Sequence, residues 1–168
     1  MKNCEEGIKI ERVWSMPSKW TFSIPAISHL LDEEIIGVSV DPFSGSSTRA
    51  THRNDMVADQ PNSMDALEWL GNLPDELADT VLYDPPYSIT QARKYGKTEY
   101  ASKKYWSDVK RELSRVLKPT GTAISFGWNS GGLGKINQCE IYRVLMVAHG
   151  GSRNDTIVTC ERKRMETK

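Results

Sequence analysis

Thr80-Val81-Leu82-Tyr83 is a short apolar run that stops at Asp84-Pro85-Pro86-Tyr87. A run of this length that is bounded by proline is typical of a buried strand ending in a rigid turn. The same pattern occurs earlier, where the apolar residues from Ile35 to Val40 stop at Asp41-Pro42 and are followed by Phe43-Ser44-Gly45-Ser46-Ser47-Thr48. Both runs predict buried strands, and each strand is expected to end in a polar turn.

The segments around these two runs alternate between helix and strand patterns. Residues 65–70 have helical spacing before Gly71 and Pro74, and apolar residues at intervals of three and four predict an amphipathic helix over residues 104–117. Further strands are expected at 121–128, 141–148 and 156–160, with a hairpin connection at 150–155 and a flexible connection at 131–134. This order predicts an α/β fold whose mostly parallel sheet carries an antiparallel C-terminal hairpin.

Length and composition favour a single intracellular domain. The chain has 168 residues, and domains usually hold roughly 100 to 200, so residues 1–168 are predicted to form one domain. No apolar run is long enough for a membrane helix, and residues 1–11 alternate charged and polar groups where a signal peptide is apolar. Cys4, Cys139 and Cys160 are far apart, which disfavours a disulfide framework and a zinc cluster. A cytoplasmic location is expected, with no metal.

The two polar turns are candidates for a ligand site. In open α/β sheets, ligands bind outside the carboxyl ends of the strands. Asp41 supplies a carboxylate there, and Gly45 lets the backbone approach a ligand closely. At residues 84–87 two successive prolines remove two amide donors, so carbonyl acceptors stand beside an acidic side chain and an aromatic ring. A pocket rich in acceptors, with a ring for stacking, suits an exocyclic amine on a planar base.

At these residues the sequence resembles the amino-methylating DNA methyltransferases. Asp84-Pro85-Pro86-Tyr87 matches their catalytic motif, and Asp41-Pro42-Phe43-Ser44-Gly45-Ser46-Ser47 is similar to their cofactor motif, usually written D-P-F-x-G-S-G. Segments 20–25, 54–55 and 84–91 are similar to the phage and prophage adenine-specific (N6) enzymes. The resemblance covers roughly residues 16 to 160. It implies a Rossmann-like methyltransferase fold and S-adenosylmethionine as cofactor.

The resemblance also implies roles for individual residues. Asp84 and the Pro85 carbonyl would accept hydrogen bonds from the adenine N6 amine, and Tyr87 would stack on the base, which makes the catalytic set Asp84, Pro85, Pro86 and Tyr87. The cofactor would contact Phe22, Pro25, Asp41, Pro42, Phe43, Gly45, Asn54, Asp55 and Asp65. Structural interpretations compete at three of these positions: core packing for Phe22, a turn for Asp55, and a helix N-terminal acid for Asp65.

The sequence departs from the family pattern in two respects. Ser47 stands where the commoner motif has glycine, and no segment is long enough for a separate target-recognition region. Residues 88–103, rich in Lys, Arg and Tyr, are the sizeable candidate for contacting nucleic acid. Residues 92–118 hold 9 basic and 3 acidic residues, so this loop and helix could face DNA. A solvated helix face explains the same charge equally well.

Other functions remain open at this stage. An initial Asp in the 84–87 motif favours adenine over cytosine N4 or protein glutamine, but an extruded base does not reveal whether DNA or RNA delivered it. The missing recognition region also allows a non-catalytic, cofactor-binding subunit that needs a partner, or a homodimer that pairs two small surfaces. A hydrolase triad is disfavoured because the three histidines lie in no recognisable motif.

Overall fold

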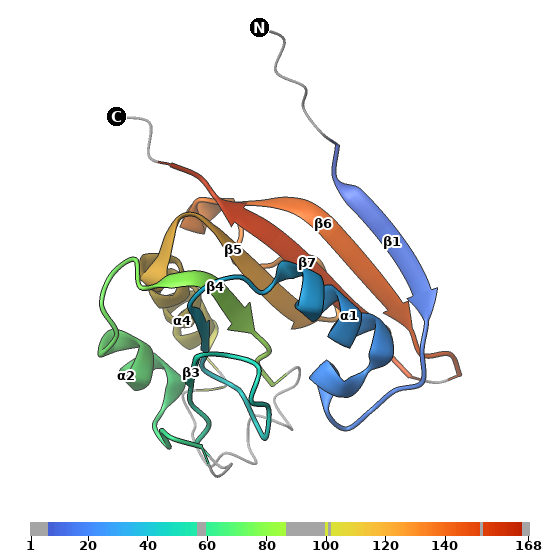
Figure 1. The fold of residues 1–168 in the computed structure, drawn as a ribbon, viewed down its shortest axis with the longest axis horizontal. Coiled ribbons are helices and arrows are strands. Elements are labelled where there is room, and N and C mark those ends of the chain that lie inside the picture. Colours follow the sequence, from blue (N-terminus) through green and yellow to red (C-terminus); the bar gives the residue numbers. More distant parts are fainter. Residues whose placement is uncertain (1–6, 57–59, 87–99, 101, 152, 166–168) are drawn as a thin grey trace, which may run out of the picture.

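The computed structural model describes residues 7–56, 60–86, 100, 102–151 and 153–165. These residues form one seven-stranded sheet with helices on both faces (Figure 1). The helices are α1 (Pro25–Glu34), α2 (Ala66–Gly71) and α4 (Lys103–Val116), with short 3-10 turns at Thr21–Ser23 and Lys135–Asn137. The strands are β1 (Lys9–Trp14), β2 (Ser39–Asp41), β3 (His52–Arg53), β4 (Ala78–Tyr83), β5 (Leu117–Gly127), β6 (Cys139–Ala148) and β7 (Thr156–Lys163).

The spatial order of the strands is β1-β6-β7-β5-β4-β2-β3. β3, β2, β4 and β5 pair in parallel, and β1 pairs in parallel with β6. β7 is antiparallel to both of its neighbours, β5 and β6. The predicted α/β fold, with a mostly parallel sheet and an antiparallel hairpin near the C-terminus, is therefore confirmed.

The strand order reverses between β2 and β4. From β2 the chain moves outward to β3 at the sheet edge, and it then returns to the other side of β2 to form β4. The connections after β2 and β4 run in opposite directions, which opens a crevice at the carboxyl ends of these two strands. Ligands bind in such crevices in α/β folds. Both polar turns singled out in the sequence, at residues 41–48 and 84–87, follow these two strands.

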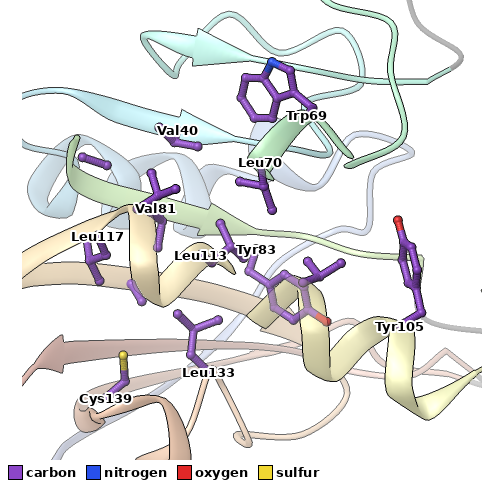
Figure 2. Packing of buried hydrophobic residues seen from close by; sticks show 14 of the residues in the cluster. Val40, Trp69, Leu70, Val81, Tyr83, Tyr105, Leu113, Leu117, Leu133 and Cys139 are labelled. Atoms are coloured by element: carbon purple, nitrogen blue, oxygen red, sulfur yellow. The ribbon is translucent and has the colours of Figure 1, made fainter. Parts of the chain in front are cut away.

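Alternating residues of β4 divide between two hydrophobic cores. Val81 and Tyr83 face the core that contains α2 and α4, shown in Figure 2, whereas Leu82 faces the core beneath α1. β5 alternates in the same way, with Ala123 in the first core and Ile124 in the second. The central strands are thus buried on both faces, which explains why they read as continuous apolar runs rather than alternating ones.

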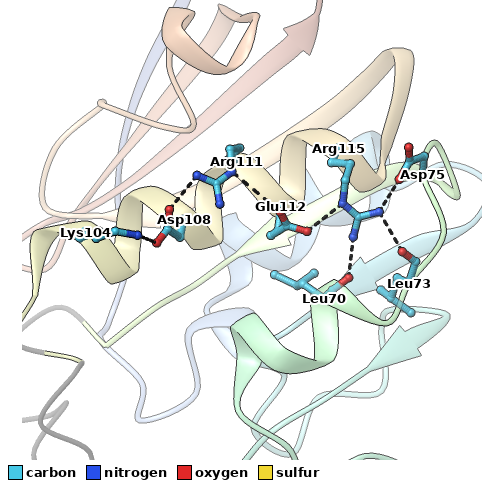
Figure 3. Close-up of polar contacts among 8 residues, drawn as sticks. All are labelled: Leu70, Leu73, Asp75, Lys104, Asp108, Arg111, Glu112 and Arg115. Carbon is cyan, nitrogen blue, oxygen red and sulfur yellow. Dashed lines mark hydrogen bonds and ion pairs between the residues drawn. The ribbon is translucent and has the colours of Figure 1, made fainter.

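The polar side of α4 joins the helix to its surroundings, as Figure 3 shows. Arg115 donates hydrogen bonds to the carbonyls of Leu70 and Leu73 at the end of α2, and it pairs with Asp75 and Glu112. Lys104 and Arg111 of the same helix pair with Asp108. Lys118, at the start of β5, pairs with Asp79. Much of the positive charge expected to face DNA is thus matched by neighbouring acids. Residues 92–99 lie outside the described residues.

Two expectations about secondary structure need correction. The first strand was expected to begin at Ile35 but begins at Ser39. Gly37 has a φ of +58°, and the Val38 amide donates to the Asp79 carboxylate at 2.8 Å, so a tight turn replaces the start of the strand. The connection at 131–134, expected to be flexible, is fixed because the amides of Leu133 and Gly134 donate to Glu161. Among the described residues, no helix has the length and apolarity needed to cross a membrane.

Candidate functional site

Asp41 ends β2 and is the most deeply buried carboxylate at the crevice, with 1% of its surface exposed. Its Oδ1 accepts a hydrogen bond of 3.0 Å from the Phe43 amide, which folds the chain back over the strand end. Its Oδ2 is buried and has no hydrogen-bond partner among the described residues. An unsatisfied buried acceptor costs about 1 to 3 kcal/mol. A ligand that donated a hydrogen bond to this oxygen would offset that cost.

Contacts between the segments after β2 and β3 hold the turn that follows Asp41. Gly45 has a φ of +53°, a conformation that suits glycine, and its amide donates to Asp55 Oδ2 at 2.9 Å. Asn54 is fully buried, and its amide group bonds to the backbone of Pro42 and Met64. The predicted cofactor residue Asn54 therefore holds the two segments together.

Both polar turns line one cavity at the switch point. It encloses about 380 Å³ of space between side chains, part of it open to solvent. Asp84 and Pro86, which follow β4, form one side of it. The remaining lining comes from Pro42 and Phe43 after β2, from Asn54, Asp55 and Met56 after β3, and from Met64, Ala66 and Tyr100. The structure thus brings together two sequence motifs that are about forty residues apart.

The electrostatics of this cavity are dominated by carboxylates. Burial raises the pKa of the Asp41 carboxyl to about 8. The hydrogen bond from the Phe43 amide opposes this rise, the charges of Asp84 and Asp55 add to it, and Arg53 opposes it. Asp41 therefore keeps its proton at pH 7 while the cavity is empty of cations. Two acidic side chains, Asp55 and Asp84, line the cavity and favour a positively charged ligand.

Asp65 lies at the N-terminus of α2, where its Oδ1 accepts hydrogen bonds from the amides of Leu67 and Glu68. Its Oδ2 accepts hydrogen bonds of 3.0 Å from the hydroxyls of Tyr100 and Tyr105. The helix N-terminal role considered for this residue is therefore present in the structure. A contact between Asp65 and a cofactor stays a prediction.

Trp20 of the N-terminal segment lies beside the turn at Gly45. A Cβ placed on Gly45 would lie 3.6 Å from the Trp20 ring, so the indole covers this turn. Phe22 packs on Phe126 with ring centroids 4.9 Å apart, and Pro25 opens α1 on the exposed surface. The core role considered for Phe22 is thus observed, and cofactor contacts of Phe22 and Pro25 stay predictions.

Some predicted residues cannot be placed. Tyr87 and the segment 88–99 lie outside the described residues, so the stacking role of Tyr87 and the nucleic-acid role of this loop stay predictions. Asp84 and Pro86 line the cavity described above. Pro85, which lies between them in the chain, lines a second cavity toward β5. Sequence reasoning did not identify that second cavity.

Comparison with solved structures defines the class of fold. TrmN from Thermus thermophilus matches with a TM-score of 0.53 and 18% identity over 83% of this chain and 49% of that chain. The 1,6-didemethyltoxoflavin-N1-methyltransferase of Burkholderia thailandensis, solved with bound 1,6-didemethyltoxoflavin and S-adenosylhomocysteine, matches with a TM-score of 0.54 and 14% identity over 83% and 76%. The chain spans about half the length of TrmN. It has a Rossmann-like methyltransferase fold.

Sequence comparisons add no closer assignment. No family model matches the chain, and no curated protein sequence matches it.

Proposed function

We propose that this protein transfers a methyl group from S-adenosylmethionine to the N6 amine of adenine in DNA. The observation that carries the proposal is the shared cavity at the switch point, where Asp84 and Pro86 face Pro42, Phe43 and Asp55. The fold supports it, and so does the ligand S-adenosylhomocysteine, which the structure of the Burkholderia thailandensis enzyme contains. The choice of adenine rests on the resemblance of residues 84–87 to the adenine-specific motif.

The charge of the cavity fits the proposed cofactor. S-adenosylmethionine carries a sulfonium and an ammonium group, and when bound it supplies an electrophilic methyl carbon whose sulfur leaves as a neutral thioether. Asp41 has a buried oxygen that no other described residue contacts through a hydrogen bond, and its pKa is raised by burial and by the neighbouring carboxylates. A cation close to Asp41 would favour the ionised carboxylate and pair with it. Asp55, next to the Gly45 turn, would hold another polar part of the cofactor.

Asp84 and the Pro85 carbonyl would act on the amine that receives the methyl group. Both are acceptors, and the prolines at positions 85 and 86 offer no amide hydrogen that would compete for the amine's lone pair. Two hydrogen bonds from the amine would direct its lone pair away from these acceptors and stabilise positive charge as the N–C bond forms. The methylated nitrogen then releases one proton and is neutral again.

Nucleic acid has to deliver the base in an extruded form. An adenine inside a duplex cannot reach a cavity at the end of a sheet, so the enzyme must flip the base or act on single strands, which costs a few kcal/mol. Once the amine is in line with the methyl group, positioning supplies much of the rate.

Transfer of a labelled methyl group tests the proposal. The protein is incubated with methyl-labelled S-adenosylmethionine and with duplex DNA, single-stranded DNA or RNA, and the modified nucleoside is identified by mass spectrometry. We expect N6-methyldeoxyadenosine. Asp84→Asn should lower kcat by about 100-fold or more while S-adenosylhomocysteine binds within a few-fold of wild type. Asp32→Asn, which removes an exposed carboxylate of α1, is the matched control and should keep full activity.

Each other outcome points to a different function. Label that appears only in RNA would replace DNA by RNA as the substrate. Label on cytosine N4 would overturn the choice of base. A wild-type protein that binds the cofactor but methylates none of the nucleic acids would support a non-catalytic subunit.

A further inference from the structure

A second cavity lies on the other side of the 84–86 segment, at the carboxyl ends of β4 and β5. It encloses about 580 Å³, part of it open to solvent. Its lining includes Tyr83, Pro85, Lys110, Ser125, Trp128 and Asn129. Pro85 therefore presents one face to a cavity that the cofactor motif does not reach, whereas Asp84 and Pro86 line the cavity that it does reach.

Lys110 is the cation of this second cavity. It projects from α4, is half-buried, and holds its ammonium 5.5 Å from the centroid of the Tyr83 ring. Within the part of the chain that the structure describes, no hydrogen bond or ion pair engages this ammonium. Burial lowers the pKa of Lys110, and the charge of Glu161 opposes this. The Glu161 carboxylate already accepts the amides of Leu133 and Gly134, so Lys110 keeps three donors without an acceptor.

Ser125 provides an independent sign that the second cavity is built for a ligand. The residue is 5% exposed, and its buried hydroxyl has no hydrogen-bond partner among the described residues. Buried polar groups in native proteins are nearly always paired, so each exception calls for an explanation. Ser125 lines the same cavity as Lys110 and Pro85.

We propose that this second cavity receives the acceptor base and that Lys110 determines which base is accepted, by donating a hydrogen bond to an unprotonated ring nitrogen beside the amine. The inference rests on the proposed function and makes it more specific. Pro85 and Lys110 line the cavity; a proline has a carbonyl acceptor and no amide donor, and a lysine ammonium is a donor. That pairing fits an exocyclic amine flanked by a ring nitrogen with a free lone pair.

This donor and acceptor pattern is met by adenine and by cytosine. In adenine the N6 amine lies between N1 and N7, which are both acceptors, and in cytosine the N4 amine lies beside the acceptor N3. In guanine the N2 amine lies between the N1–H donor, which would oppose the ammonium of Lys110, and the acceptor N3, which is crowded by the glycosidic bond. Thymine has no amine. Tyr83, Phe126 and Trp128 add aromatic surface to the cavity walls, which suits a planar ring.

Deaza substrates test the role of Lys110 directly. Oligonucleotides carry a single target as adenine, 1-deazaadenine or 7-deazaadenine, and kcat/KM is measured for each. We expect wild type to lose about 10- to 100-fold on the analogue that lacks the contacted nitrogen. Lys110→Met keeps the length of the side chain but loses the donor, so it should be slow on adenine and should show no more than about a 2-fold difference between adenine and that analogue.

The control variant separates this role from general attraction to nucleic acid. Lys103→Met removes an exposed lysine at the start of the same helix and should keep the wild-type discrimination. Ser125→Ala should lower kcat/KM on adenine less than Lys110→Met does. Binding of S-adenosylhomocysteine within 2-fold of wild type shows that each variant is folded and that the first cavity is intact. If Lys110→Met discriminates the analogues as wild type does, the inference is overturned.

A binding measurement keeps this inference separate from the proposed function. Affinities are measured, on protein saturated with S-adenosylhomocysteine, for single-stranded oligonucleotides that differ only in one adenine or guanine. A preference for adenine that Lys110→Met abolishes and Lys103→Met retains supports the base pocket even if no methyl transfer is detected. Methyl transfer with a base preference that is independent of Lys110 supports the enzyme and rejects the pocket. Absence of any preference in wild type also rejects the pocket.

Discussion

The amide of Gly45 donates a 2.9 Å hydrogen bond to the Oδ2 of Asp55, and this contact joins the turns that follow β2 and β3. Asp55 is buried, with 8% of its surface exposed, and lines the first cavity. The same carboxylate therefore shapes the Gly45 turn and adds negative charge to the cavity. A substitution at Asp55 is therefore expected to affect both the stability of the Gly45 turn and the binding of a ligand in the first cavity.

Substitutions at Asp55 should separate these two contributions. Asp55→Asn keeps an oxygen for the Gly45 amide and removes the charge, whereas Asp55→Ala removes both. We expect Asp55→Asn to weaken S-adenosylmethionine binding about 10-fold and to change stability little. Asp55→Ala should weaken binding further and lower the free energy of unfolding by about 1 to 2 kcal/mol, because the partly buried Gly45 amide loses its acceptor. Calorimetric titration and urea unfolding measure the two effects.

Binding of S-adenosylmethionine by Asp55→Asn as tight as by wild type would contradict a role for the charge of Asp55. It would show that the carboxylate acts on the ligand only by supporting the turn.

Asp41 should make the stability of the cofactor-free protein depend on pH. Its pKa is raised from 3.8 in the ordinary case to about 8 in the folded protein. Between these values the unfolded chain releases the proton and the folded protein keeps it, so stability falls as pH rises from about 4 to about 8 and then stays level. Asp41→Asn retains an oxygen for the Phe43 amide but has no charge to bury. Its stability advantage over wild type should therefore widen across this range in urea unfolding.

The same linkage predicts how cofactor affinity changes with pH. A cation that pairs with ionised Asp41 must displace the proton, so affinity should rise with pH up to about 8 and flatten above it. Asp41→Asn should bind more weakly and lack this dependence. A wild-type affinity that is independent of pH between 5 and 8 would place the cationic groups of the ligand away from Asp41.

Gly132 should resist substitution because it lies against a buried carboxylate. It has a φ of +51°, and a Cβ built on it would lie 2.2 Å from Glu161 Oε2. Gly132→Ala should therefore cost about 1 kcal/mol of backbone strain together with about 1 to 3 kcal/mol of overpacking. It should also impair adenine discrimination, because Gly132 lines the second cavity.

Gly151 is the matched control for this substitution. Its φ is +61°, and nothing lies within 4 Å of a Cβ placed there. Gly151→Ala should show the backbone cost alone, about 1 kcal/mol. Comparable losses of stability for the two variants in thermal or urea unfolding would contradict the packing of Gly132 on Glu161.

Arg143 joins three elements at the side of the sheet away from the site. It is 8% exposed and pairs from β6 with Glu11 of β1 and with Glu33 and Glu34 of α1. Arg143→Met should destabilise the protein by about 2 kcal/mol, since a paired cation leaves its acids uncompensated. Arg143→Lys, which keeps one charge, should lose less. Both variants should bind S-adenosylhomocysteine normally, and weakened binding would show that α1 orientation influences the first cavity.

The sequence predicted the central strands and their polar ends well. β4 and the end of β2 could be recognised because strands buried on both faces are apolar at every position. α1 was not predicted, although Pro25 at its start and the spacing of Ile27, Leu30 and Leu31 are helix signals. β1 carries no comparable signal, because it lies at the sheet edge with mostly exposed residues and pairs with β6, more than a hundred residues later.

The sites were predictable to different degrees. The first cavity followed from two motifs that lie at neighbouring strand ends. The second depends on Lys110, which in the sequence is one of many cations in residues 92–118. Its inward position is set by the angle at which α4 packs on the sheet, a tertiary feature that charge counting does not contain. The ion pairs of Arg115 and Lys118 with acids from other segments could not be predicted either, because they also depend on tertiary packing.

The place of β7 has a consequence for how the protein is made. This strand comes late in the chain, yet it lies between β5 and β6 and pairs with both. During synthesis the nascent chain therefore exposes two open sheet edges until residue 163 has left the ribosome exit tunnel. Ribosome-bound chains that stop before Thr156 should bind chaperones and be cleaved readily by proteases, and protection should appear in one step once β7 emerges.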